Sequence, residues 1–172
     1  MDAEAVYSIV PPDNSEPVKI TEQALFQSAM LKELVTTLGD AAKNEPIPYT
    51  QNNTPRFIIE KVVEWCEQHK TETLLSLRFE QENSEESKHI ELPRWDREFL
   101  SSIDSQDDAL YHLTAAANYL EIGKLYRYCC KFIYDNHVKG KNVDEIRRYF
   151  HETDDFTPEE KKQLEEENKW FT

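Results

Sequence analysis

The segment Gln106–Glu121, written QDDALYHLTAAANYLE, constrains the fold most, because its spacing predicts a helix with two separate contact sides. One side consists of Leu110, Leu113, Ala116, Ala117 and Leu120. The other consists of Tyr111, Ala115, Asn118, Tyr119 and Ile122. A surface helix needs only one apolar side for its own core. We therefore expect the first side to be buried and the second, with its tyrosines and asparagine, to meet a partner. The alternative is a helix buried on both sides within its own domain.

The net charge of the chain limits which kinds of molecule we expect it to bind. Its 172 residues are enough for one domain of ordinary size plus an appendage. The formal net charge of −14 repels phosphate backbones, so nucleic acid is not expected as a partner and basic protein surfaces are favoured. No apolar stretch is long enough to span a membrane, and the N-terminal MDAEAVYSIVPP lacks the features of a signal peptide.

The cysteines indicate a reducing compartment. There are three of them, an odd number, and the adjacent Cys129 and Cys130 cannot readily pair with each other. Without a disulfide framework, we expect the protein in the cytoplasm and nucleus.

The sequence contains no active site that we would defend. Three glycines are too few for a phosphate-binding loop, and Cys66 and His69 lack companions at metal-ligand spacing, so no cofactor or metal is expected. A nucleophilic Cys129 or Cys130, with a histidine elsewhere as base, is the one enzymatic alternative. Cysteines among apolar helix residues are usually inert, so we expect a protein that is not an enzyme.

The pattern of elements predicts an α/β body of the α+β kind. Strands are expected at Ala5–Val10, Val18–Ile20 and Glu45–Tyr49, the first two as a hairpin. Helices are expected at Gln23–Gln27, at Met30–Leu38, after Thr54, after Pro93, and from Gly123 to about Asn136. The helix after Thr54 has that residue as its cap and Pro55 at its first position, and it ends at His69, whose ring should satisfy backbone carbonyls.

Two segments look unable to build a core. Lys70–Glu91 is polar and acidic, so we expect a mobile loop with Leu74–Phe79 as its one anchor. Near the C-terminus, Asn142 caps a two-turn helix, and Thr157 opens another whose aliphatic anchor is Leu164. That last helix should either pack on the body through Trp170 or stay loose until a partner supplies apolar surface. We expect it to stay loose until a partner binds.

Four segments together resemble the S-phase kinase-associated (Skp) adaptor family, the small subunit that links F-box proteins to a cullin in SCF ubiquitin ligases. They are LPRWDREFL (92–100), AANYLEI (116–122), GKNVDEIRRYF (140–150) and DDFTPEEKKQLEEENKW (154–170). Their order and spacing match the family over most of the chain from Pro46 onward. An extra alanine before the AANYL motif, with Tyr126 and Tyr128 in the following helix, marks a divergent paralogue with a restricted set of F-box partners.

The resemblance implies a BTB/POZ-like body over residues 1–136, with a small N-terminal sheet and a helical bundle, followed by F-box-binding helices over 137–172. It implies that Asn118 and Tyr119 face the cullin, and the rest of their helix side adds Tyr111, Ala115 and Ile122. Carried over by position, the F-box contacts are Cys130, Ile133, Ile146, Phe150, Phe156 and Trp170, to which we add the anchor Leu164.

The function implied is that of a non-catalytic adaptor with two protein partners, an F-box protein and a cullin. The alternative is a self-associating BTB-type scaffold, in which the spare helix sides pair copies of the chain in a homodimer.

Overall fold

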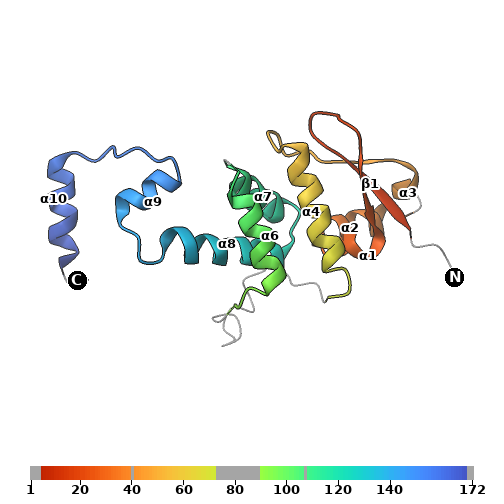
Figure 1. The fold of residues 1–172 in the computed structure, drawn as a ribbon. Coiled ribbons are helices and arrows are strands. Elements are labelled where there is room, and N and C mark those ends of the chain that lie inside the picture. Colours follow the sequence, from red (N-terminus) through yellow and green to blue (C-terminus); the bar gives the residue numbers. More distant parts are fainter. Residues whose placement is uncertain (1–4, 40, 73–89, 107, 170–172) are drawn as a thin grey trace. The chain divides into compact units, whose positions relative to one another are not determined.

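The computed structural model describes residues 5–39, 41–72, 90–106 and 108–169. Helices and a small sheet make up a mixed α+β fold (Figure 1). The chain forms two compact units, Met1–Phe132, called the body below, and Ile133–Thr172, called the C-terminal unit. Residues 133–136, which the sequence analysis grouped with the body, fall in the C-terminal unit.

The body begins with a three-stranded sheet in the order β2-β1-β3. Strand β1 (Val6–Val10) pairs antiparallel with β2 (Val18–Thr21) and parallel with β3 (Ile47–Pro48). Alternation along β1 buries Tyr7 and Ile9 on one face. The predicted hairpin and third strand are confirmed. Strand β3 is short because proline has no N–H for the ladder, which confines Pro48 to an edge.

Short helices follow the hairpin. They are α1 (Glu22–Leu25), α2 (Ala29–Leu38) and α3 (Ala41–Asn44), the last of which was not predicted. Helix α2 ends as expected at Gly39, whose positive φ of 57° suits a residue without a side chain. At its start, Ser28 accepts a hydrogen bond from the Leu31 N–H at 3.0 Å.

Helix α4 (Arg56–Gln68) fills the centre of the body, packed against β2, α1 and helix α7. Its helical spacing buries Ile58, Ile59, Val62, Val63, Trp65 and Cys66.

The predictions made for the two ends of α4 are wrong. Pro55 is the N-cap residue and not the first helical one, and the buried Thr54 donates instead to the Tyr49 hydroxyl at 3.5 Å. The His69 ring contacts two carboxylates and no backbone carbonyl that the structure records.

Three further helices complete the body: α6 (Arg94–Asp104), α7 (Ala109–Tyr119) and α8 (Gly123–Ile133), whose last residue belongs to the C-terminal unit. Helix α7 packs against α4 and α6. It is shorter than predicted, because Asp108 and Glu121 adopt positive φ angles of 54° and 53° beside its two ends. The buried side predicted for α7 is confirmed, since none of its five residues is more than 2% exposed.

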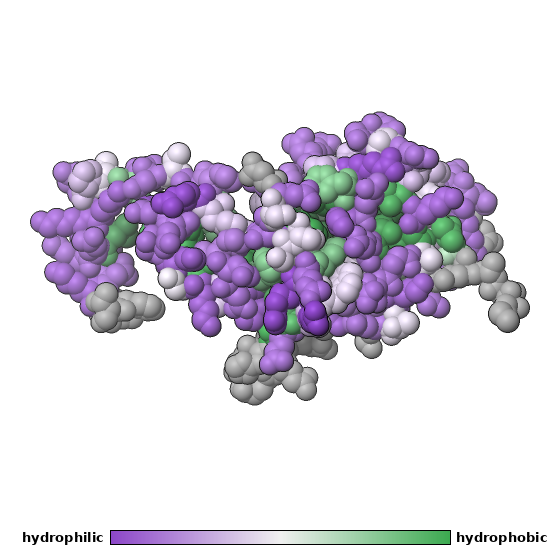
Figure 2. Space-filling model, viewed as in Figure 1, coloured by the Kyte–Doolittle hydropathy of each residue, from purple (hydrophilic) through white to green (hydrophobic). Residues whose placement is uncertain are grey.

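The C-terminal unit continues with a π-helical turn (Tyr134–Val138), α9 (Val143–Tyr149) and α10 (Pro158–Glu167). Both predicted helix starts are confirmed as capping boxes, Asn142 with Glu145 and Thr157 with Glu160. No residue between 133 and 169 is buried. Hydrophilic residues dominate the surface seen in Figure 2.

The predicted anchors Trp170 and Leu74–Phe79 lie outside the described residues, as does most of the predicted loop Lys70–Glu91.

Candidate protein-interaction surfaces

The first candidate surface is the side of α7 that faces away from its core. Tyr111 is 67% exposed there, Asn118 is exposed and Ala115 is half-buried. Their spacing of four and three residues places these side chains along one line of the helix. An exposed tyrosine of this size, with an amide two turns further on, has the composition of a protein interface rather than of a solvated helix side. Of the alternatives considered, burial on both sides of this helix is excluded.

Tyr119 occupies the end of this surface and is held in place. Its ring meets Tyr49 edge-on with centroids 5.0 Å apart, and its hydroxyl shares a hydrogen bond of 2.5 Å with the Thr50 hydroxyl. The Tyr49 hydroxyl in turn donates to Gln51 Oε1 at 2.7 Å. The surface therefore extends from α7 onto the exposed Thr50, which lies after β3, while the buried Tyr49 supports it from below. Sequence reasoning missed Thr50, since a contact across 69 residues leaves no local pattern.

Ile122 does not belong to this surface, which corrects the sequence analysis. Its side chain is 1% exposed. The prediction carried helical periodicity past Tyr119, where α7 ends. Beyond that point Glu121 turns the chain, and the Ile122 N–H bonds to the Ala117 carbonyl at 2.8 Å. The turn directs Ile122 into the core of the body instead of onto the exposed side of α7.

The second candidate surface lies in the C-terminal unit, where large apolar side chains remain uncovered. Phe150 is 45% exposed, Phe156 43% and Leu164 41%, while Ile133 and Ile146 are half-buried. The sequence analysis missed two further exposed residues, Tyr134 and Val143. Their signal was present as apolar residues at helical spacing beside Ile133 and Ile146.

Salt bridges shape this second surface around Phe156. The Arg147 guanidinium lies 5.6 Å from the centre of the Phe156 ring and 3.4 Å from Asp154. Asp154 also pairs with Lys161, and the hydrogen bond from that lysine holds the pKa of the Asp154 carboxyl below its usual value. These exposed pairs orient the segment before α10, although such pairs contribute little free energy individually.

Two family comparisons bear on these surfaces. Residues 14–71 match the Skp1 family tetramerisation domain, a POZ domain, and residues 123–171 match the Skp1 family dimerisation domain. The chain is 36% identical over 159 residues to the E3 ubiquitin ligase complex SCF subunit sconC of Talaromyces stipitatus, covering 91% of this chain and 92% of that one. It is 32% identical over 162 residues to suppressor of kinetochore protein 1 of Schizosaccharomyces pombe, covering 94% of each.

The chain belongs to the Skp1 family. A further relative is the SCF subunit sconC of Arthroderma benhamiae, 35% identical over 153 residues, which cover 89% of this chain and 87% of that one. Family membership confirms the resemblance drawn from the four sequence segments. The POZ-domain match and the small sheet with its helices confirm the predicted BTB/POZ-like α+β fold.

The cysteines of this Skp1-family chain do not resemble nucleophiles. Cys66 and Cys129 are buried, and burial raises the pKa of Cys129 to about 12 and that of Cys66 still further. Cys130 is exposed, and its thiol pKa is raised by partial burial although a hydrogen bond from Tyr126 acts against this. A catalytic thiol needs a lowered pKa. The environment of these thiols is therefore the opposite of what the cysteine-enzyme hypothesis requires.

The described residues hold no group of three or more histidine, cysteine, aspartate or glutamate side chains suited to a metal ion. Among the helices in the same described ranges, none is both long and apolar enough to cross a membrane.

Proposed function

We propose that this Skp1-family protein is a non-catalytic adaptor of an SCF-type ubiquitin ligase, which bridges an F-box substrate receptor to a cullin. The observation that carries the proposal is the exposed side of α7, on which Tyr111 is 67% exposed while the opposite side of the same helix is fully buried. A relative that aligns with this chain over 92% of its own length is named as an SCF subunit. That name indicates the kind of assembly in which such a surface would be used.

The cullin contact in this proposal consists of Asn118, Tyr119, Tyr111 and Ala115, and it gains Thr50. The hydrogen bond shared with Thr50 and the edge-on contact with the Tyr49 ring fix the Tyr119 side chain before a partner arrives. Binding then orders fewer side chains, and preorganisation of this kind strengthens affinity.

The F-box contact consists of Cys130 and Ile133 on α8, followed in the C-terminal unit by Ile146, Phe150, Phe156, Leu164 and Trp170. Exposed phenylalanines in a unit where none of residues 133–169 is buried favour a partner that supplies the missing apolar cover. A segment that completes its packing on a partner can cover a large surface of that partner. Ordering the segment is unfavourable, however, and this reduces the net free energy of binding.

The mechanism of such an adaptor is geometric. One chain that holds the substrate receptor and the scaffold at the same time raises the local concentration of substrate near the ubiquitin-carrying enzyme. No group on the adaptor needs to donate, accept or transfer a proton. We infer from the three free thiols, two buried and one exposed, that the protein works in reducing compartments, the cytoplasm and nucleus.

Reciprocal surface variants test the proposal. Asn118→Lys with Tyr119→Lys should abolish cullin binding and leave F-box binding intact, because charge would be forced into an aromatic interface. We expect a loss of about 3 kcal/mol or more, on the order of a hundredfold in Kd, measured by calorimetry with purified cullin. Phe150→Lys with Phe156→Lys should produce the reverse pattern.

A charge-matched control separates surface from net charge. Ser101→Lys with Ser105→Lys adds the same two charges to an exposed position of α6 and to the exposed residue that follows this helix, and it should change neither affinity. Cullin binding by the Asn118/Tyr119 variant at unchanged affinity would refute the cullin assignment. If both surface variants lost both partners, the chain would not carry two separable surfaces.

Self-association is a second candidate function, favoured by the dimerisation and tetramerisation domains that the chain matches. In this case the exposed side of α7 or the C-terminal unit would meet a second copy. Light scattering distinguishes the two: an adaptor should become a single copy when cullin and F-box protein are added, whereas a scaffold should remain a dimer.

A further inference from the structure

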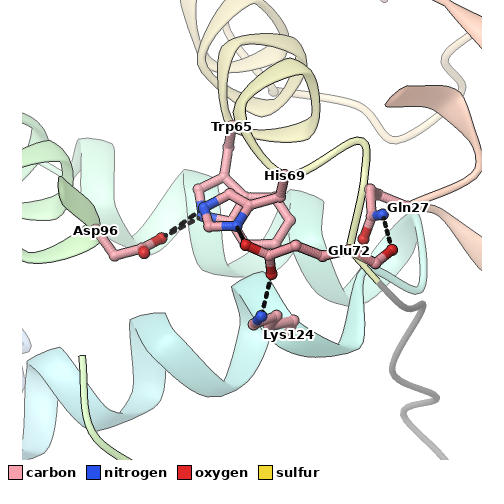
Figure 3. Close-up of polar contacts among 6 residues, drawn as sticks. All are labelled: Gln27, Trp65, His69, Glu72, Asp96 and Lys124. Atoms are coloured by element: carbon pink, nitrogen blue, oxygen red, sulfur yellow. Dashed lines mark hydrogen bonds and ion pairs between the residues drawn. The ribbon is translucent and has the colours of Figure 1, made fainter. Parts of the chain in front are cut away.

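A chain of polar side chains lies inside the body, where α4, α6 and α8 meet (Figure 3). The Trp65 Nε1–H donates to Asp96 Oδ1 at 2.8 Å, and His69 Nε2 lies 3.0 Å from the same oxygen. The Trp65 and His69 rings stack with centroids 4.1 Å apart. Asp96 is 1% exposed and His69 5%, so these groups are shielded from water.

The other nitrogen of His69 also faces a carboxylate. Nδ1 lies 2.9 Å from Glu72 Oε1, and Glu72 Oε2 accepts a hydrogen bond from the Lys124 ammonium group at the start of α8. The Glu72 backbone carbonyl accepts from Gln27 Nε2 at 2.8 Å. Burial acts to raise the Glu72 pKa, but the hydrogen bonds from Lys124 and His69 outweigh it and lower the pKa. Glu72 is therefore ionised at neutral pH.

The geometry dictates the protonation state of the imidazole. A neutral imidazole has one N–H, whereas two carboxylate oxygens, which only accept, face its two nitrogens. With one proton, a ring lone pair would lie against a carboxylate oxygen in a buried site. With two protons, both contacts are charge-assisted hydrogen bonds. Asp96 Oδ2 has no hydrogen-bond partner in the described part of the chain, so Asp96 depends on contacts to its other oxygen.

The groups around His69 favour its cationic form. Asp96 and the uncharged ring of Trp95 face it from α6, and Glu72 from the turn after α4. From α8, Lys124 reaches it only through Glu72, and burial raises the pKa of Tyr128 so that this phenol stays neutral. Burial acts to lower the His69 pKa, but hydrogen bonds to Asp96 and Glu72 prevail and raise that pKa above its usual value.

We propose that doubly protonated His69 is a proton-dependent latch, which fastens the turn 69–72 and the start of α8 to α6 and releases them when the ring loses a proton. Once the ring is neutral, one of the two carboxylates loses its histidine donor, and a buried Asp96 left with only the uncharged Trp65 N–H is strongly unfavourable. The turn must then move or a carboxyl must take up a proton. This latch is independent of the proposed adaptor function.

The sign of the pH dependence follows from the raised pKa of His69. A group that binds its proton more tightly in the folded state stabilises that state below its unfolded pKa, about 6.5 for histidine. The stabilisation is lost as the pH rises through the folded pKa. The latch is therefore closed in mildly acidic solution and opens on the alkaline side.

An NMR titration of the full-length protein tests the latch. The His69 ring signals should show two N–H groups at mildly acidic pH and titrate at a higher pH than an unperturbed histidine. Asp96→Asn should move that titration to lower pH. Glu98→Gln is the matched control, because it neutralises an exposed carboxylate of α6 that pairs with Arg94 and should leave the His69 titration unchanged.

A second variant covers the case in which Asp96→Asn fails to fold. Glu72 lies at the surface with a side chain 39% exposed, and Glu72→Gln should also lower the pH at which His69 titrates. The pH dependence of urea unfolding should flatten around and above neutrality in His69→Gln. A His69 that titrates at or below the usual histidine value, or equal shifts in Glu72→Gln and Glu98→Gln, would overturn the latch.

Discussion

Helix α7 of the body and helix α10 of the C-terminal unit have nearly the same length, but they differ in how much of their surface is buried and in their local capping signals. Helix α7 spans 11 residues and places one full side in the core, while the 10 residues of α10 are all exposed. Helix α10 has the better local signals, namely proline in its first turn and a complete capping box. Helix α7 begins after a left-handed Asp108 that makes no side-chain cap.

The contrast between α7 and α10 distinguishes two sources of helix stability, namely burial in a core and local capping. A cap contributes about 1 kcal/mol, and an isolated helix of this length is marginal in water even with good propensities. A fully buried leucine contributes about 1.5–3 kcal/mol relative to an exposed one. Helix α7 therefore gains its stability from the body, whereas α10 relies on local interactions until another surface covers it.

Amide exchange should show the largest contrast between the two helices. In the free protein we expect the core amides of α7 to be protected by about 10⁴-fold and those of α10 hardly at all, measured by NMR or mass spectrometry. Addition of an F-box protein should slow exchange in α9 and α10. Equal protection of α7 and α10 in the free protein would remove the contrast, and equal rates with and without the F-box protein would argue against folding on binding.

A pair of identical substitutions should show the next largest effect. Leu113→Ala in α7 removes a side chain that is 0% exposed and should lower the unfolding free energy by about 3–5 kcal/mol. Leu164→Ala in α10, where the leucine is 41% exposed, should change it by no more than about 0.5 kcal/mol. Urea unfolding followed by far-UV circular dichroism measures both, and similar losses at the two positions would mean that α10 is packed in solution.

Helix caps should give the smallest and most local difference. Thr157→Ala should reduce the stability of α10 by about 1 kcal/mol, visible as lower helicity and unchanged urea midpoint of the body. Ser28→Ala should instead lower the urea midpoint, because Ser28 caps α2 and also donates to the buried Leu120 carbonyl. If Thr157→Ala shifted the midpoint as well, the two units would unfold together.

Much of the body could be predicted because its signals are local. Alternation identified the hairpin, Gly39 marked the end of α2, and helical spacing identified the buried side of α7. The errors concern the two ends of α4, the short helix α3, and one place where periodicity was extended past an element. Ile122 was assigned to an exposed helix side, although α7 had already ended at Tyr119.

The candidate surfaces were predicted in part. Tyr111 and Asn118 are exposed as expected, because one side of α7 was already committed to the core. The contact of Thr50 with Tyr119 and that of His69 with Asp96 could not be predicted, since the partners are 69 and 27 residues apart in the chain. Such contacts depend on which elements meet, and residue spacing within one segment carries no record of that.

By itself the sequence determined the hairpin, the starts of α9 and α10, which side of α7 enters the core, and that the last helix has too little apolar surface to bury. These properties depend on neighbouring residues, which the chain order keeps together. Only the tertiary structure decided that Ile122 turns inward, that Thr50 holds Tyr119, and that two carboxylates enclose His69. The contacts of Thr50 with Tyr119 and of Asp96 with His69 join segments far apart in the chain, and they exist only once the core has brought those segments together.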